Sequence, residues 1–380
     1  MTEVALTPRI CRSKNVVEKS SRDKISLFCN VPEAHVLSIH DLPNIYHVPK
    51  LMIEQNLHSL LVKRLELAAK TPADTKTIFK NPYAKKWMDM TDVIENAKDV
   101  ATIALVGKYT TQQDSYLSVI SALKHSCIAT NQQLKLVWVE SSHLEEGSSS
   151  KEQHEEAWKA VKAADGILVP GGFGIRGIEG KVLAIRYARE AKVPFLGICL
   201  GMQVAVIEFT RSFLGRKLAN SKEFAPEVSD EDAAIIFMPE GDKTSMGGTM
   251  RLGSRRTVLR PGSLACALYG DKEHVDERHR HRYEVNPDLV SSLESKGLIF
   301  SGKDENKERM ECVELDSKMH PHPYFMAVQF HPEFKSRPMR PSPVFLGFLK
   351  AILERNGGRA AAVNAKTPKT AAKRVKVLKK

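Results

Sequence analysis

The sequence lacks the features that mark membrane-spanning, secreted or disulfide-bonded proteins. No apolar stretch reaches the roughly 18 residues that a membrane helix needs. The first residues do not combine a positive segment with an apolar block, so no secretory signal peptide is predicted. The six cysteines form no Cys-x-x-Cys pair, which argues against a zinc site and a disulfide framework and favours a reducing cytoplasm.

Acidic residues are absent from residues 355–380, which contain nine Lys and Arg. Without them the net charge of +12 falls to +3, so the rest of the chain gives no strong nucleic-acid signal. Little in this segment could build a core, and we expect residues 356–380 to form a disordered basic tail. Residues 372–380 also have the composition of a nuclear-import or polyanion patch, but a solvated tail is the simpler interpretation.

From Val100 onward, apolar runs typical of buried strands alternate with segments of helical periodicity. We expect strands at 100–106, 134–139, 165–169 and 193–199, and helices at 116–125, 152–163 and 181–191. This alternation predicts an α/β fold in which a mostly parallel sheet carries helices on both faces. In such sheets reactive groups collect at the carboxyl ends of the strands.

The residues before Val100 follow a different pattern. Residues 24–29 and 36–39 have strand-like composition, and residues 51–67 have apolar positions at helical spacing. Residues 70–99 combine prolines with charges, which is typical of a linker. We therefore expect a separate segment ahead of the α/β domain.

Cys199 lies in Gly197-Ile-Cys-Leu-Gly201, directly after an apolar strand-like run. A strand followed by Gly-x-Cys-x-Gly is the layout of a nucleophile elbow, where glycines permit a sharp turn and one side chain stands exposed above the sheet. A cysteine in an apolar strand is more often an inert core residue. The helix expected next would favour the thiolate, which makes Cys199 a candidate nucleophile.

A second strand-like run ends in His331-Pro-Glu333. Residues two apart on a strand point to the same face, so this segment can supply both a base and the carboxylate that orients it. With Cys199 they would form a cysteine version of the acyl-transfer triad.

A glycine-rich stretch, residues 170–177, lies between an expected strand and helix. Gly172, Gly174 and Gly177 match the dinucleotide-binding fingerprint. That fingerprint requires an acidic residue at the end of the next strand, and here the strand ends in Cys199. We instead expect an oxyanion loop, with the N–H of Leu200 as a second donor.

The run from Glu277 to Asn286 is dense in Arg and His. It is compatible with a solvated basic face. Metal binding by His279 and His281 is disfavoured because no further ligands cluster nearby in the sequence. The functional alternative is an arginine that grips a carboxylate through two hydrogen bonds.

These motifs resemble the class I glutamine amidotransferases and, more specifically, the CTP synthase family. The stretches that carry the resemblance cover about residues 8–355: 106–109, 121–125, 170–180, 197–203, 248–253, 278–286 and 329–334. The resemblance implies that glutamine is hydrolysed through a glutamyl thioester and that the ammonia is passed on. In the full-length family this ammonia serves the ATP-dependent amination of UTP to CTP, a step of pyrimidine biosynthesis.

The resemblance also implies a role for individual residues. The triad corresponds to Cys199, His331 and Glu333. Contacts to the substrate L-glutamine correspond to Gly172, Leu200, Gly201, Met202, Gln203, Glu223 and Arg282, with Arg282 on its α-carboxylate and Glu223 on its α-ammonium. Lys24 matches a UTP contact, and the ATP adenine contact matches His40, Asp41 and Leu42. The activator GTP corresponds to Arg176 and Arg251.

The resemblance divides the chain into four parts. Residues 1–50 resemble the end of the family's synthetase domain, 51–99 a helix and interdomain linker, 100–355 the amidotransferase domain and 356–380 the tail. The family's phosphate loop and Mg²⁺ carboxylates are not expected here, so this chain is predicted to hold only the ammonia-producing half, without metal or cofactor. Mg-ATP, tetramers and filaments are implied only for proteins with the synthetase domain.

Two alternatives remain open. A stand-alone γ-glutamyl hydrolase would keep the triad but has no reason to keep the residues from Lys24 to Leu42. A non-catalytic subunit that joins oligomers of the family would use the same surfaces without turnover.

Overall fold

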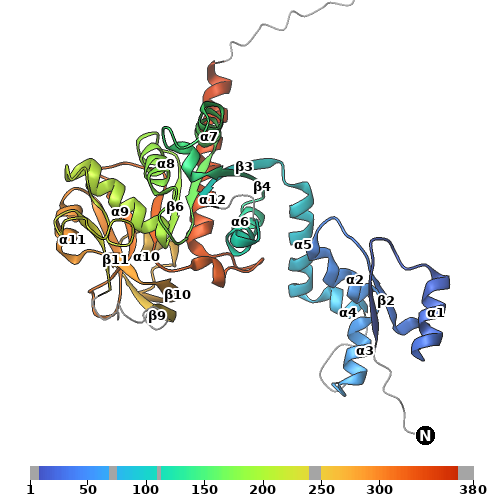
Figure 1. Ribbon diagram of the computed structural model, residues 1–380. Coiled ribbons are helices and arrows are strands. Elements are labelled where there is room, and N and C mark those ends of the chain that lie inside the picture. Colours follow the sequence, from blue (N-terminus) through green and yellow to red (C-terminus); the bar gives the residue numbers. More distant parts are fainter. Residues whose placement is uncertain (1–7, 68–74, 109–112, 239–249, 367–380) are drawn as a thin grey trace, which may run out of the picture. The chain divides into compact units, whose positions relative to one another are not determined.

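The computed structural model describes residues 8–67, 75–108, 113–238 and 250–366, and only the backbone of residues 358–366. The chain divides into two compact units, residues 1–97 and residues 98–380. Each is described by itself (Figure 1).

The N-terminal unit is built from a parallel pair of strands, β1 (Arg9–Arg12) and β2 (Val36–Ile39), and from short helices. All four residues of β2 are buried. The helices are α1 (Lys19–Cys29), η1 (Glu33–His35), η2 (Ile45–His47), α2 (Val48–Glu54), α3 (Leu57–Arg64), α4 (Thr75–Lys80) and α5 (Pro82–Asn96).

Residues 24–29 were expected to form a strand, and this expectation is wrong, because they complete α1. Asn30 ends the helix in the left-handed conformation, with φ of 48°, and its N–H donates to the carbonyls of Leu27 and Ser26. An asparagine tolerates this conformation better than most residues and so marks a helix end. A short apolar run alone could not distinguish a strand from a helix.

The expected linker over residues 70–99 is also wrong for most of its described length, because α4 and α5 occupy it. The side chain of Asn81 accepts a hydrogen bond of 2.8 Å from the N–H of Tyr83 and caps α5. Pro82 follows at the first helical position, where it costs no hydrogen bond. The proline therefore starts a helix here rather than a loop.

The C-terminal unit contains a nine-stranded sheet in the order β10-β9-β12-β13-β14-β6-β5-β3-β4. The strands from β14 to β4 are parallel, and those from β10 to β14 are antiparallel. The parallel strands are β3 (Asp99–Gly107), β4 (Gln132–Glu140), β5 (Gly166–Val169), β6 (Phe195–Ile198) and β14 (Phe325–Val328); the others are β9 (Arg251–Leu259), β10 (His274–His281), β12 (Leu298–Lys303) and β13 (Met310–Leu315). A small second sheet joins β7 (Asn220–Ser221), β8 (Ala233–Phe237) and β11 (Tyr283–Val285).

Helices cover both faces of the large sheet, as expected from the sequence (Figure 1). Ile167 and Val169 of β5 join one apolar core, whereas Leu168 between them joins the other. The first core includes residues of α7 (Lys151–Ala163), α8 (Ile178–Glu190), α9 (Leu200–Phe213) and α11 (Pro287–Ser295), and the second those of η3 (Gln113–Tyr116), α6 (Leu117–Ala129), α10 (Leu264–Leu268) and α12 (Pro343–Lys366). The turns η4 (Ser141–Leu144) and η5 (Pro332–Lys335) complete the unit.

The helix α12 continues to Lys366, past the start of the tail expected at residue 356. That boundary is therefore placed too early for the backbone. The remainder of the expected tail, residues 367–380, lies outside the described residues.

Residues Gly297–Lys303 have the Gly-x-x-x-x-Gly-Lys spacing of a phosphate loop, so the expectation that this spacing is missing is wrong. Asp304 stands where such a loop has Ser or Thr. Residues 298–303 form strand β12 and do not connect a strand to a helix. The match is therefore accidental.

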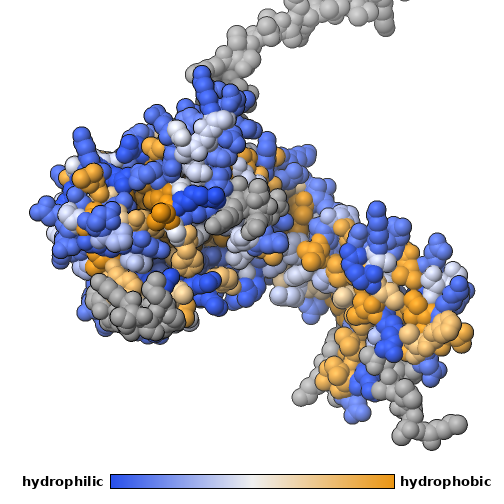
Figure 2. Space-filling view, viewed as in Figure 1, coloured by the Kyte–Doolittle hydropathy of each residue, from blue (hydrophilic) through white to orange (hydrophobic). Residues whose placement is uncertain are grey.

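Apolar side chains are prominent on the visible surface of the N-terminal unit (Figure 2). Leu27 and Phe28 of α1 are 77% and 85% exposed. Within the described residues, no helix has the length and apolar character needed to cross a membrane.

Candidate active site

Cys199 sits at the junction between β6 and α9, as the elbow interpretation expected. Its φ of 52° and ψ of −102° lie outside the conformations that L-residues normally adopt. The N–H of Cys199 donates to the carbonyl of Val328 on the neighbouring strand β14 at 2.7 Å. The carbonyl of Cys199 accepts from the first turn of α9, so the strained residue is held from both sides.

The two glycines beside Cys199 act differently from the sequence expectation. Neither Gly197 nor Gly201 has a positive φ; the sharp turn falls on Cys199 itself. A Cβ on Gly197 would lie 2.8 Å from the Cβ of Ala327, and a Cβ on Gly201 would collide with the carbonyl oxygen of Val169. The glycines are therefore needed for close packing of α9 against the sheet.

His331 and Glu333 also meet, although not on a strand as expected. Strand β14 ends at Val328, and His331 precedes the turn η5, which contains Glu333. The Nδ1 atom of His331 lies 2.9 Å from Oε1 of Glu333, and the imidazole also hydrogen-bonds to Cys199. The three predicted residues thus form a continuous line from thiol to imidazole to carboxylate.

The protonation of His331 is governed by these two neighbours. Burial alone would lower the pKa of the imidazole, but the hydrogen bonds and charges of Cys199 and Glu333 raise it to about 10. A histidine that stays protonated at neutral pH beside a cysteine favours a thiolate–imidazolium pair. The imidazole therefore carries a positive charge beside the sulfur of Cys199.

The expected exposure of the Cys199 side chain is wrong, because the residue is 6% exposed and packs in the second apolar core. Burial of a nucleophile excludes bulk water from the reacting atoms.

The glycine-rich loop between β5 and α8 lies against the triad. A Cβ on Gly171 would be 3.0 Å from the His331 ring and 3.5 Å from the Cβ of Cys199, whereas Gly172 has open space apart from Leu200 at 3.6 Å. Lys108, at the end of β3, donates from Nζ to the carbonyls of Phe173 and Gly174. This arrangement fits a loop whose backbone faces the reacting centre.

Lys108 follows the strand expected at residues 100–106, and its contacts with the glycine loop give it a structural role. Burial, more than the charge of Arg176, lowers the pKa of its ammonium group. Its position after a buried parallel strand was the available signal.

Glu223 and Arg282 come from different parts of the chain and lie near each other. Burial raises the pKa of Glu223, whereas the positive charges of Arg282 and Lys108 and a hydrogen bond from the backbone of Gly174 lower it. A carboxylate and a guanidinium are thus gathered beside the glycine loop. Such a pair is the complement of an amino acid's ammonium and carboxylate groups.

Three other predicted glutamine contacts lie in the first turn of α9 and are buried. Met202 is fully buried in the first apolar core, and Gly201 packs against Val169. The amide nitrogen of Gln203 donates to the carbonyl of Tyr283 at 2.9 Å. The side chains of Met202 and Gln203 therefore lie inside the fold.

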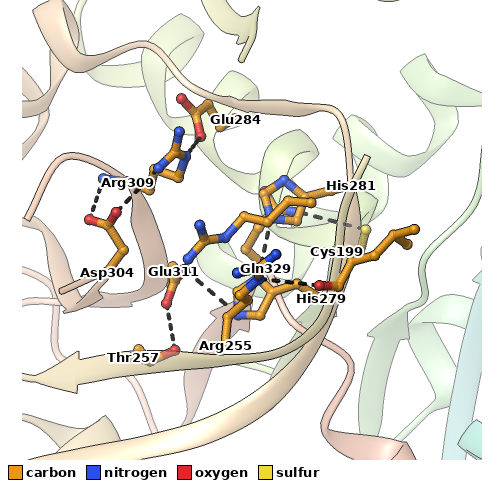
Figure 3. Close-up of polar contacts among 12 residues, drawn as sticks. Cys199, Arg255, Thr257, His279, His281, Glu284, Asp304, Arg309, Glu311 and Gln329 are labelled. Atoms are coloured by element: carbon orange, nitrogen blue, oxygen red, sulfur yellow. Dashed lines mark hydrogen bonds and ion pairs between the residues drawn. The ribbon is translucent and has the colours of Figure 1, made fainter. Parts of the chain in front are cut away.

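The row of arginines and histidines on β10 has two faces. Residues alternate between exposed and buried, with Glu277, His279 and His281 on the buried side. The Nδ1 atom of His279 lies 3.2 Å from Nε2 of His281 (Figure 3). Burial lowers their pKa values to about 2 and about 3, so both histidines are neutral.

Among the described residues, no group of three His, Cys, Asp or Glu side chains could hold a metal ion. His279 instead lies 3.7 Å from Glu311, whose carboxylate accepts a hydrogen bond from Thr257 (Figure 3). The same carboxylate also accepts a hydrogen bond from Arg251. Burial raises the pKa of Glu311 to about 7. Sequence patterns could not reveal this cluster because its members come from three strands.

The predicted nucleotide contacts are divided between the two units. Arg251 is paired with buried Glu311 at 3.0 Å, and Arg176 forms an exposed ion pair with Glu140 at 3.3 Å. In the N-terminal unit Lys24 is exposed on α1, and three contacts follow β2: His40, Asp41 and Leu42. Asp41 is paired with Arg12.

Comparison with known protein families matches two parts of the chain. The family described as glutamine amidotransferase class-I matches residues 112–351, which include the whole triad. The family described as CTP synthase N-terminus matches residues 2–67.

Individual relatives agree with these matches. A CTP synthase from Candida glabrata is 46% identical over 90% of this chain and 59% of its own length, and one from Dictyostelium discoideum is 48% identical over 91% and 62%. The chain thus spans about three fifths of the length of these relatives. The solved glutaminase domain of Trypanosoma brucei CTPS, with bound acivicin, has 39% identity and a TM-score of 0.61 over 67% of this chain and 94% of that domain.

Proposed function

Because this chain belongs to the CTP synthase family and carries its class I glutamine amidotransferase domain, we propose that it hydrolyses glutamine through Cys199, His331 and Glu333. The observation that carries this proposal is the line from thiol to imidazole to carboxylate at the carboxyl ends of β6 and β14. The reaction is glutamine + water → glutamate + ammonia.

In the first half-reaction the sulfur of Cys199 attacks the γ-carboxamide carbon of glutamine. A C–S bond forms, and the carbonyl electron pair moves onto oxygen. The N–H of Leu200, at the start of α9, and that of Gly172 stabilise this oxyanion, since the first N–H groups of a helix have no partner within the helix. His331 gives its proton to the amide nitrogen, the C–N bond breaks, and ammonia leaves.

In the second half-reaction His331 takes a proton from water, and the hydroxide attacks the thioester carbon. The C–S bond breaks, and glutamate leaves with the sulfur again a thiolate. Glu333 accepts a hydrogen bond from the other ring nitrogen throughout and holds the imidazole in one tautomer.

Recognition of the free amino acid falls to Glu223 and Arg282. Arg282 binds the α-carboxylate and Glu223 the α-ammonium of glutamine. Two observations support this assignment: the charge of Arg282 acts on the pKa of Glu223, and the backbone of Gly174 in the glycine loop hydrogen-bonds to Glu223. Lys108 keeps the glycine loop beside that carboxylate.

The ammonia serves the family's ATP-dependent amination of UTP to CTP. The curated relatives of this chain are described as CTP synthases, and residues 2–67 match the N-terminal family. We propose that a polypeptide of these 380 residues performs the glutaminase half alone, because it contains no complete phosphate loop.

The test is a glutamine hydrolysis assay on the purified 380-residue chain, with glutamate and ammonia measured separately. Equal amounts of both are expected, together with a glutamyl adduct on Cys199 trapped by acid quenching. CTP formation is measured in parallel from UTP, ATP and ammonia, and none is expected.

Three results of these assays would contradict the proposal, each in a different way. A folded chain that binds glutamine without turnover would support a non-catalytic subunit. Turnover of γ-glutamyl peptides in preference to glutamine would support a γ-glutamyl hydrolase. Appreciable CTP would contradict the restriction to the glutaminase half.

A further inference from the structure

We propose that Gln329 is an additional catalytic residue, which donates a hydrogen bond to the sulfur of Cys199 and stabilises its thiolate form. Gln329 follows β14 and is fully buried. Its Nε2 atom lies 3.6 Å from Sγ of Cys199, within the range of an N–H···S hydrogen bond. The inference deepens the proposed function, because it assigns a role in the same thiol chemistry.

The orientation of the Gln329 amide follows from its neighbours. The terminal nitrogen of Gln203 donates to the backbone carbonyl of Tyr283 at 2.9 Å, and a carbonyl can only accept. The same nitrogen lies 3.2 Å from Oε1 of Gln329. The oxygen of Gln329 therefore faces Gln203, and its NH₂ group faces the sulfur.

The surroundings fix this arrangement further. The carbonyl of Tyr283 also receives a hydrogen bond from Nδ1 of neutral His281 at 3.1 Å. The backbone N–H of Gln329 donates to the carbonyl of Glu311 at 2.9 Å. Both ends of Gln329 are thus held, and Figure 3 shows it among Cys199, His281 and Glu311.

The chemical consequence follows from what a carboxamide NH₂ can do. It has no lone pair for a proton, so it cannot act as the base, and the thiol proton goes to His331. It can stabilise a negative sulfur, whereas the carbonyl of Arg280, 3.8 Å from Sγ, can only accept from the neutral thiol. Gln329 thus favours the thiolate, and Arg280 favours the thiol.

The experiment replaces the donor without changing its size. Gln329→Met removes the N–H group, and Gln329→Glu replaces it with an oxygen that cannot donate when ionised. The control is Gln132→Met, since Gln132 is a buried glutamine on β4 at the far edge of the sheet. The main readout is the rate of Cys199 alkylation by iodoacetamide as a function of pH, which requires no glutamine turnover.

For Gln329→Met we expect the alkylation rate at pH 7 to fall about tenfold or more and the reactive pH range to move upward, since a hydrogen bond to a charged group is stronger than one between neutral groups. Gln329→Glu should lose more, and Gln132→Met should match the wild type. In glutamine hydrolysis kcat should fall and KM should stay within about twofold, because Gln329 contacts the sulfur and not the recognition pair.

Unchanged alkylation profiles in both Gln329 variants, with folding verified by circular dichroism, would overturn the inference. If Gln329→Met does not fold, the alkylation profile of the isosteric Gln329→Glu tests the inference by itself. Failure of the proposed function is distinguishable, because it would leave wild-type alkylation intact while glutamine is not hydrolysed.

Discussion

Gly201 packs against the carbonyl oxygen of Val169 so closely that no Cβ atom could stand between them. This contact holds the first turn of α9 against β5 and thereby sets the position of Cys199. Gly172, only one loop away, has open space on its Cβ side. Close packing therefore excludes any larger residue at position 201, whereas at position 172 it does not.

Gly201→Ala should destabilise the C-terminal unit by about 2 kcal/mol or more, because the new methyl group displaces α9 or the sheet. The melting temperature should fall by about 4–8 °C. Gly172→Ala is the matched control and should melt like the wild type. Equal melting temperatures for both variants would contradict the packing argument.

Cys199→Ala should abolish glutamine hydrolysis, with a loss of about 10⁴-fold or more. It should also lower the pKa of His331 from about 10, since the hydrogen bond and charge of Cys199 are major causes of that raised value. The histidine is followed by NMR titration. An electrophilic glutamine analogue should label Cys199 and spare Cys127, because burial raises the pKa of Cys127 to about 12. A His331 pKa that does not move would show that the two side chains are not coupled.

Arg282→Lys should raise KM for glutamine about tenfold or more while kcat changes little, because an ammonium cannot replace the two parallel hydrogen bonds of a guanidinium to a carboxylate. Arg256→Lys is the control: Arg256 pairs with Asp276 at the surface. An unchanged KM in steady-state kinetics would place Arg282 on a solvated basic face, the alternative that the sequence left open for residues 277–286.

Stability should decrease on acidification below pH 6.5. Burial lowers the pKa of four histidines to about 2–4: His125, His279, His281 and His322. Below pH 6.5 these histidines are protonated in the unfolded chain but stay neutral in the folded chain. The stability linked to them is therefore lost as the pH falls.

Glu277 and Glu311 act in the opposite direction. Burial raises their pKa values to about 7, so the stability they contribute is complete below pH 4.5 and is lost as the pH rises through 7. His331 acts with the glutamates, because its raised pKa of about 10 lets the folded chain keep a proton that the unfolded chain loses above pH 6.5. The four neutral histidines outweigh these three groups once the histidines of the unfolded chain are protonated, so the melting temperature should fall between pH 6 and pH 5. Glu311→Gln should steepen this slope, whereas Glu305→Gln, at an exposed position, should not. A flat profile for the wild type would refute the assignment of neutral histidines.

The sequence predicted the parts of the fold in which pattern and tertiary structure agree. The buried strand ahead of Cys199 and the helix after it were recognisable because glycines and apolar runs are local signals. The region around α1 and α5 was misassigned, because the short apolar run ending at Cys29 is ambiguous and Pro82 starts a helix rather than ending one. Both capping residues, Asn30 and Asn81, were visible in the sequence.

The site divides in the same way. Triad residues can be found from the sequence because a strand end and a turn place them together, even though Glu333 lies on a turn and not on a strand. Gln329 and Lys108 could not be assigned, since their roles depend on which atoms of other segments face them. Which atom of a side chain donates or accepts depends on the groups that the fold brings next to it.

The backbone conformation of Cys199 lowers the stability of the folded chain. A residue with φ of 52° and ψ of −102° costs about 1–3 kcal/mol unless it is glycine. Cys199→Gly should therefore give a chain that is inactive but more thermostable than Cys199→Ala. A glycine at this position would relax the backbone and at the same time remove the thiol, so the strain accompanies the proposed nucleophile and cannot be relieved by glycine without losing it.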